Sequence, residues 1–190
     1  MATFTVVYDA CVLYPAPLRD LFIRIAGSGI VRARWSRLIL EEMTTSLLRD
    51  RNDLTREQLS RTVDLMAQAV PDGIVERFEP LIDVIELPDD DDRHVVAAAI
   101  RCGAQAIVTF NLKDFPDRDL ERWHLEPKHP DEFLLDTIDL SQAVVVRCLT
   151  EQAASLRNPP VSIPEILVHL RNLGLVRSVS ALQDLLRAAP

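Results

Sequence analysis

The pattern of apolar and polar positions along this chain predicts a protein of alternating strands and helices. The β-branched and aromatic run at residues 3–8 is typical of a buried strand. Residues 18–27 and 37–48 repeat apolar positions three and four apart, which predicts two amphipathic helices, and residues 31–34 predict a short strand between them. Strands that alternate with helices favour an α/β fold with a parallel sheet.

Capping residues mark where several helices begin. Ser36 precedes the helix at 37–48, and Thr55 with Gln58 forms a capping box that predicts a helix to about Ala69. The remaining patterns before residue 128 predict weak strands at 74–78 and 84–87, a helix at 92–102, a buried strand at 106–110 and an edge strand at 123–125.

The last third of the chain is predicted to be entirely helical. Its expected helices span 131–137, 140–156 with Asp139 and Gln142 as caps, a stretch from the capping box of Ser162 and Glu165 to about Gly174, and 179–188. This tail has no acidic cluster and no evident chemistry. We therefore expect a domain at residues 1–128 followed by a C-terminal helical extension at residues 129–190.

Composition places the chain among ordinary globular proteins, because 48% of its residues are hydrophobic. It has no apolar run of the roughly 18 residues that a membrane span needs, and its N-terminus lacks the features of a signal peptide. The three cysteines lie at scattered spacings without a CxxC pair, which favours free thiols and a cytoplasmic location.

Charge is unevenly spread over a chain whose net charge is −8. Residues 19–61 contain nine arginines and six acids, whereas residues 64–139 contain 19 acids and seven bases. An acidic protein is a poor general binder of nucleic acid, but a local arginine-rich face can hold one short backbone segment. Arg32, Arg34 and Arg37 are candidates for contacts with RNA phosphates, and solvated surface charge is the alternative reading.

Carboxylates follow two predicted strands, at the end where α/β sheets bind their ligands. Asp9 comes directly after the first strand, and Asn111 and Asp114 come directly after the strand at 106–110. The alternative for Asp9 is a turn or helix-capping role. These positions make Asp9 and Asp114 candidates for one shared site at the carboxyl edge of the sheet.

Two further acids are expected to point towards the same edge from helices. Asp92 ends a run of four aspartates and stands at the start of the apolar stripe of the helix at 92–102. The alternative for one or two of these aspartates is capping of the helix N-terminus, whose partial positive charge favours acids. Glu42 lies nearer the apolar face of its helix than Glu41 does, and a solvated surface acid is its alternative reading.

Four like charges brought together cost free energy unless a cation offsets them. Carboxylate oxygens without paired His or Cys suit Mg²⁺ or Mn²⁺, and a water on such an ion can attack a phosphodiester. Thr109 and Asn111 are placed to orient a carboxylate or a water. The chain has no GxSxG, GxxxxGK[ST] or GxGxxG motif, and its four histidines show no ligand spacing.

The motifs in this order resemble those of the PIN-domain nucleases, and most of all the VapC-type toxins of bacterial toxin–antitoxin pairs. The resemblance covers residues 3 to about 127 and rests on DACVLYP, ILEEM, DDRHVVAAAI and VTFNLKDFP. Each motif is weak alone, and their combination is specific. DEFLLD and LRNPP in the tail also resemble the C-terminal helical extension of one actinobacterial VapC subgroup.

This resemblance implies a three-layer α/β/α fold and a Mg²⁺-dependent endoribonuclease. The resemblance places the acidic quartet of the family on Asp9, Glu42, Asp92 and Asp114. It implies that Asp9, Asp92 and Asp114 bind the metal ion and that Asn111 is the supporting polar residue. Glu41 remains an alternative to Glu42, and Asp91 or Asp89 to Asp92. The resemblance further implies a cognate antitoxin protein that blocks the site, and a homodimer.

Other functions were weighed against this one. A phospho-acceptor receiver domain needs a second acid near the end of the first strand and a lysine after a later strand, whereas DACVL has no second acid and Lys113 follows the Thr109 strand itself. A silent protein-interaction module would not need a complete acidic quartet. A PIN-domain protein that acts on structured DNA remains the nearest alternative, and tRNA, ribosomal RNA and messenger RNA are all open as targets.

Overall fold

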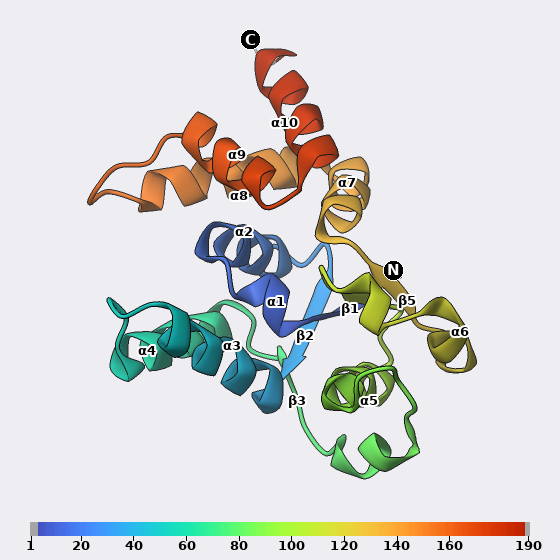
Figure 1. Cartoon of the computed structure of the whole chain (residues 1–190). Helices are drawn as coiled ribbons and strands as arrows, with labels where there is room; N and C mark the ends of the chain where they lie inside the picture. The colour runs from blue at the N-terminus through green and yellow to red at the C-terminus, as the bar shows by residue number, and fades with distance from the viewer. Residues whose placement is uncertain (1–3, 189–190) are drawn as a thin grey trace.

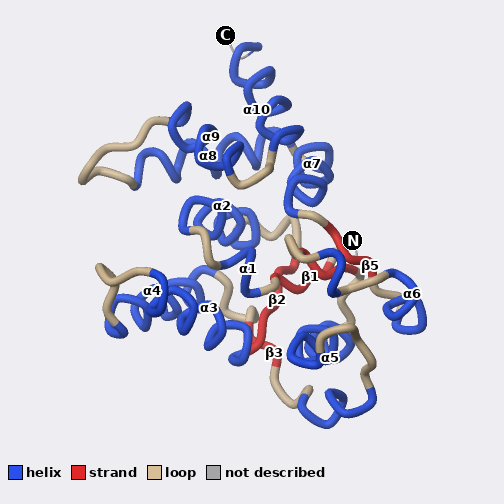
Figure 2. The backbone as a smooth tube through the Cα atoms, viewed as in Figure 1, coloured by secondary structure: helices blue, strands red, loops and turns tan. Residues whose placement is uncertain are grey.

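A parallel sheet forms the centre of the molecule in the computed structural model, which describes residues 4–188 (Figure 2). Thr3, expected to open the first strand, lies outside these residues. The strands are β1 (Thr5–Tyr8), β2 (Arg32–Ser36), β3 (Ile74–Val75), β4 (Ala106–Val108) and β5 (Glu126–Lys128). They form one five-stranded sheet in the order β3-β2-β1-β4-β5, and every pair is parallel.

Helices fill both faces of this sheet and the C-terminal part of the chain (Figure 1). The α-helices are α1 (Ala10–Leu13), α2 (Ala16–Gly27), α3 (Arg37–Asp50), α4 (Arg56–Ala69), α5 (Arg93–Cys102), α6 (Asp117–Leu120), α7 (Pro130–Leu140), α8 (Gln142–Ser155), α9 (Ile163–Asn172) and α10 (Val176–Ala188). Short 3-10 helices are η1 (Glu79–Val84), η2 (Asp90–Asp92), η3 (Leu112–Asp114) and η4 (Glu121–Trp123). Among the described residues, no helix has the length and apolar character needed to cross a bilayer.

The sheet is buried between two layers of helices. On one face, α5 contacts β1, β2 and β4 through its small alanines, all of which are buried. On the other face, the ring of Tyr8 packs on Phe22 of α2 and Phe133 of α7, with ring centroids 5.4 and 5.7 Å away. The expected three-layer α/β/α architecture is therefore confirmed.

Strand order fixes where a site can form. The chain first moves from β1 to β2 and β3 on one side, and later adds β4 and β5 on the other side. The carboxyl ends of β1 and β4 therefore flank the point at which the winding direction reverses, where such sheets leave a crevice. Asp9, one residue beyond β1, donates its backbone N–H to Val108 of β4 at 3.1 Å, which holds the two ends together.

The four C-terminal helices pack against the rest of the molecule through α2, which contacts both α8 and α9 (Figure 1). Gln152 of α8 donates to the Pro17 carbonyl at 2.9 Å, and Arg24 of α2 donates to the Ser155 hydroxyl at 2.9 Å. Lys128 of β5 pairs with Asp136 of α7 at 2.6 Å. The extension expected from the sequence is thus joined to the sheet by a shared aromatic core and by polar contacts.

Two strand predictions were wrong. Residues 84–87 form no strand, because Pro80 starts η1 at Glu79–Val84 and the chain runs on irregularly to η2. The edge strand was expected at residues 123–125 but forms at Glu126–Lys128. His124 adopts a left-handed conformation with φ 55°, which ends η4 and delays the strand, and Pro127 is tolerated because β5 is an edge strand.

Two helix boundaries in the extension also differ from expectation. The start of α8 is not capped by Asp139, which lies inside α7; Ser141 holds the cap position with no side-chain hydrogen bond. The last helix begins at Val176 instead of residue 179. Asp131 explains this earlier start, because its carboxylate accepts from the backbone N–H groups of Arg177 and Ser178 in the first turn.

Candidate active site

Asp9 lies at the carboxyl end of β1 and caps the short helix α1, and only 3% of it is exposed. One carboxylate oxygen, Oδ1, accepts from the N–H of Ala10 at 2.6 Å. The other, Oδ2, accepts from the hydroxyl of Thr109 at 2.7 Å and from the thiol of Cys11 at 3.1 Å. The capping role considered for Asp9 is present, but two further donors are aimed at the same carboxylate.

Burial raises the pKa of Asp9 above its ordinary value, and the hydrogen bonds from Thr109 and Cys11 oppose this effect. The nearby charge of Glu42 raises the pKa further. Burial and the charge of Asp9 also raise the pKa of the Cys11 thiol well above its usual range. The site therefore contains an aspartate that is costly to ionise and a thiol that stays protonated.

Asp92 ends η2 directly before α5 and is partly buried. Its side chain makes no capping hydrogen bond, whereas Asp89 accepts from the N–H of Asp91 at 3.0 Å and takes the capping role in this turn. Burial, together with the charges of Asp9, Asp89, Asp114 and Glu42, raises the pKa of Asp92 to about 7. The charges of Asp9, Asp114 and Glu42 act on Asp92, and Asp89 is near enough to act on it as well.

Glu42 belongs to α3, and its side chain is 50% exposed. Its Oε2 lies 3.6 Å from Nε2 of His94, which is two residues after Asp92. Glu41 instead lines a separate surface hollow with Arg37. Asp114 closes η3 after β4 and is partly buried. The charges of Asp9, Glu42 and Asp114, and also that of Asp89, act on Asp92, so these acids from separate segments form one acidic cluster.

Thr109 and Asn111 lie in the turn that follows β4. Thr109 is fully buried, and its hydroxyl donates to Asp9 while accepting from the backbone N–H of Asn111 at 3.0 Å. Asn111 is exposed, and its backbone carbonyl accepts from the backbone N–H of Asp114 at 2.9 Å. This hydrogen-bonded turn couples the Asp9 side of the site to the Asp114 side.

The donor chemistry of the cluster fits a hard divalent cation, because the groups that raise the pKa of Asp92 are carboxylates and no basic residue is among them. Residues 4–188 contain no group of three or more His, Cys, Asp or Glu side chains already arranged to hold a metal ion. The cluster thus has the composition of a Mg²⁺ or Mn²⁺ site.

The candidate arginines lie elsewhere. Arg32 and Arg34 of β2 line a hollow of about 750 Å³ together with Arg101 and Cys102. This hollow lies at the C-terminal end of α5, roughly 15 Å along the helix from Asp92 at 1.5 Å per residue. Arg37 lines the different hollow beside Glu41. The structure does not bring these arginines to the acidic cluster.

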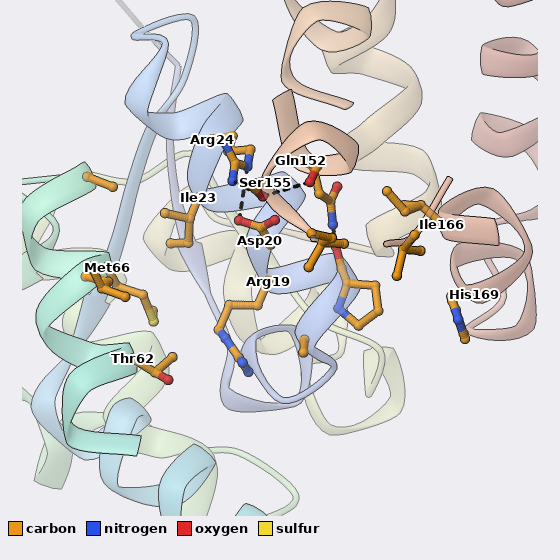
Figure 3. Close-up of a pocket in the computed structure, with 16 residues that line it drawn as sticks. Arg19, Asp20, Ile23, Arg24, Thr62, Met66, Gln152, Ser155, Ile166 and His169 are labelled. Atoms are coloured by element: carbon orange, nitrogen blue, oxygen red, sulfur yellow. Dashed lines mark hydrogen bonds and ion pairs between the residues drawn. The ribbon is translucent and has the colours of Figure 1, made fainter. Parts of the chain in front are cut away.

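An apolar groove lies between α2, α4 and the helical extension (Figure 3). Its volume is about 660 Å³, and Ile23, Met66 and Ile166 are among the apolar residues that line it. Asp20 and Arg24 form an ion pair at 3.1 Å on its wall. None of the four acids lines this groove, so it is distinct from the acidic cluster.

Two residues at the site were not anticipated from the sequence. Cys11 follows Asp9 by two positions, so its nearness was visible, but a cysteine in a short helix carries no signal of a contact with Thr109. His94 has a buried Nδ1 without a hydrogen-bond partner in the described part of the chain. Its contact with Glu42 joins residues 52 positions apart, and no local pattern reveals such a pair.

Comparisons with known proteins agree with this architecture. The sequence profile of the PIN domain matches residues 5–113, and that of the VapC50 C-terminal domain matches residues 130–184. A protein of Mycobacterium tuberculosis (strain ATCC 25618 / H37Rv) named "Putative ribonuclease VapC50" is 41% identical over 76 residues. That match covers 40% of this chain and 45% of the relative, and no solved structure matches significantly.

Proposed function

Because this chain belongs to the PIN-domain family, we propose that it is a metal-dependent endoribonuclease that hydrolyses RNA phosphodiester bonds. The observation that carries the proposal is the raised pKa of Asp92, about 7, which burial and the charges of Asp9, Asp89, Asp114 and Glu42 produce together. Carboxylates with strongly raised pKa values cluster at functional sites. The residues matched by the PIN-domain profile include the first three acids of this cluster.

We assign Asp9, Asp92 and Asp114 to Mg²⁺ binding, and Mn²⁺ suits the same oxygen donors. When bound, the ion supplies an activated water and positive charge for the phosphodiester. Thr109 holds the Asp9 carboxylate in place, and the turn at Asn111 sets the position of Asp114. We assign proton transfer to Glu42, whose half-exposed side chain has its Oε2 3.6 Å from Nε2 of His94.

We further propose that the protein is the toxin of a toxin–antitoxin pair in the cytoplasm. The name of the Mycobacterium tuberculosis relative and the profile match at residues 130–184 support this role. A cognate antitoxin protein would then block the acidic cluster, and the toxin would act as a homodimer. We divide the chain into a nuclease domain at residues 1–128 and a helical extension at residues 129–190.

The test is a cleavage assay on separate pools of tRNA, ribosomal RNA, messenger RNA and structured DNA. We expect endonucleolytic cleavage of RNA with added Mg²⁺ or Mn²⁺, and none in excess chelator. Cleavage of DNA alone would favour the alternative of a DNA-directed nuclease. Failure to cut any pool, with a folded protein and added metal, would favour a silent interaction module. A small neighbouring reading frame that encodes a DNA-binding protein would support the toxin role.

A further inference from the structure

The thiol of Cys11 lies between the two segments that form the centre of the acidic cluster. Its Sγ donates to Oδ2 of Asp9 at 3.1 Å and lies 3.4 Å from the hydroxyl of Thr109. The same sulfur accepts from the backbone N–H of Phe110 at 3.3 Å. Cys11 thereby links the start of α1 to the turn after β4, across 99 positions of the chain.

We propose that Cys11 is a positioning residue that, together with Thr109, fixes the orientation of the Asp9 carboxylate for metal binding. This inference rests on the proposed function, because it assigns Cys11 a purpose within that same site. Groups that hydrogen-bond to a metal ligand hold its orientation, and loss of one typically costs 10- to 100-fold in metal affinity or activity.

The hydrogen-bond pattern explains why a second donor to Oδ2 of Asp9, in addition to Thr109, is needed. Oδ1 of Asp9 is engaged by the N–H of Ala10, which alone would allow the carboxylate to pivot about that contact. Thr109 and Cys11 both donate to Oδ2 from different segments, so together they fix the plane of the carboxylate. Removing the thiol would also leave the N–H of Phe110 without its acceptor, and an unpaired N–H at a partly buried position is costly.

Cys102 offers a matched control within the same chain. Its thiol is also partly buried, but it donates to the Ala99 carbonyl at 3.5 Å inside α5, at the far end of that helix from Asp92. Cys102→Ala therefore removes a thiol of similar exposure without touching the acidic cluster.

The experiment measures Mn²⁺ affinity by titration calorimetry for the parent, Cys11→Ala, Cys11→Ser and Cys102→Ala, in full-length protein. We expect Cys11→Ala to bind Mn²⁺ about 10-fold more weakly. Cys11→Ser, whose hydroxyl also donates and accepts, should return affinity to within about 3-fold of the parent. Cys102→Ala should match the parent. RNA cleavage at a Mn²⁺ concentration below the dissociation constant of the parent should follow the same order.

Thermal unfolding in chelator separates positioning from packing. A role in packing alone would lower the melting temperature of Cys11→Ala and leave its Mn²⁺ affinity unchanged, which would overturn the inference. If Cys11→Ala does not fold, Cys11→Val fills a similar volume without a donor and serves in its place. A parent protein that binds no Mn²⁺ would overturn the proposed function itself, an outcome distinct from parent-like binding by Cys11→Ala.

Discussion

Two buried aspartates, one in the acidic cluster and one in the helical extension, behave in opposite ways. Asp9 is 3% exposed and Asp131 is 7% exposed, and each accepts three hydrogen bonds. Burial raises the pKa of Asp9, and its donors fail to offset that rise. Burial acts in the same direction on Asp131, but its hydrogen bonds with Ser178 and Arg177 outweigh it and lower the pKa.

The difference lies in the charges that surround each carboxylate. Asp131 faces the first turn of α10, whose N–H groups carry partial positive charge, and Glu42 contributes negative charge near Asp9. Asp131 is therefore a satisfied structural carboxylate that needs no cation. Asp9 belongs to a cluster whose negative charge is not offset by the protein, which is typical of a functional site.

The sharpest test of this contrast is Asp9→Asn. We expect RNA cleavage to fall by about 10³-fold or more, because the several kcal/mol that a bound metal ion contributes depends on its charged ligands. The fold should remain, since the asparagine amide fits the same space and the Thr109 hydroxyl can turn to accept from it. Single-turnover cleavage and circular dichroism measure the two effects. Parent-like cleavage would show that the catalytic site lies elsewhere.

Asp131→Ala should have the converse effect. Loss of the charge-assisted hydrogen bonds to α10 is expected to lower the free energy of unfolding by about 3 kcal/mol. In a chain of this length that corresponds to a melting temperature lower by roughly 10 °C. Cleavage per folded molecule should stay at the parent level. Asp139→Ala, at an exposed position of the same helix, is the control and should change stability little. Equal losses in both variants would contradict the assigned role of Asp131.

The pH dependence of stability should separate the two carboxylate environments. Because the pKa of Asp92 is about 7 in the folded protein and near 3.8 when unfolded, the folded state holds its proton more tightly between these values. Its contribution to stability is therefore present at pH 4 and is lost as the pH rises to 7 and above. Asp131, with a lowered pKa, contributes stability that is present above pH 4 and is lost as the pH falls further.

Asp92→Asn should accordingly raise the melting temperature at pH 8 in chelator and leave it nearly unchanged at pH 4. Asp92 is partly exposed, so solvent screens its charge. We therefore expect the substitution to raise the free energy of unfolding at pH 8 by about 1 kcal/mol, which corresponds to a melting temperature higher by roughly 2–4 °C. Calorimetric scans from pH 4 to 8 measure this difference. A variant that is less stable than the parent at pH 8 would show that Asp92 is not under repulsion. Added Mn²⁺ should stabilise the parent at pH 8 and should not stabilise the variant to the same extent.

The smallest expected effect concerns the arginines away from the cluster. Replacing Arg32 and Arg34 with alanine should weaken RNA binding and reduce the slope of log affinity against log salt by about 1.4 for two lost contacts with single-stranded phosphates. Binding is best measured with Asp9→Asn, so that the RNA stays intact. Alanine at Arg147 and Arg187, which form ion pairs on the extension, is the matched control. An unchanged salt slope would leave these arginines as ordinary surface charge.

Local signals in the sequence were enough to predict much of the fold. The capping boxes at Thr55 and Ser162 are both present, because each needs only atoms three residues apart. Buried strands β1 and β4 were visible as apolar runs for the same reason. The start of α10 could not be predicted from such local signals, because Asp131 sets it from 46 positions away.

The sequence alone determined which residue types were available: four separated acids, a threonine after the second buried strand, and helices between them. The tertiary structure decided which of them meet. It put Glu42 within 3.6 Å of His94 and Glu41 beside a separate hollow, engaged Asp89 in a backbone cap, and brought Thr109 within 2.7 Å of Asp9 across 100 positions. The physical reason is that helix period and capping act over a few residues, whereas the parallel pairing of β1 with β4 sets contacts that no local pattern encodes.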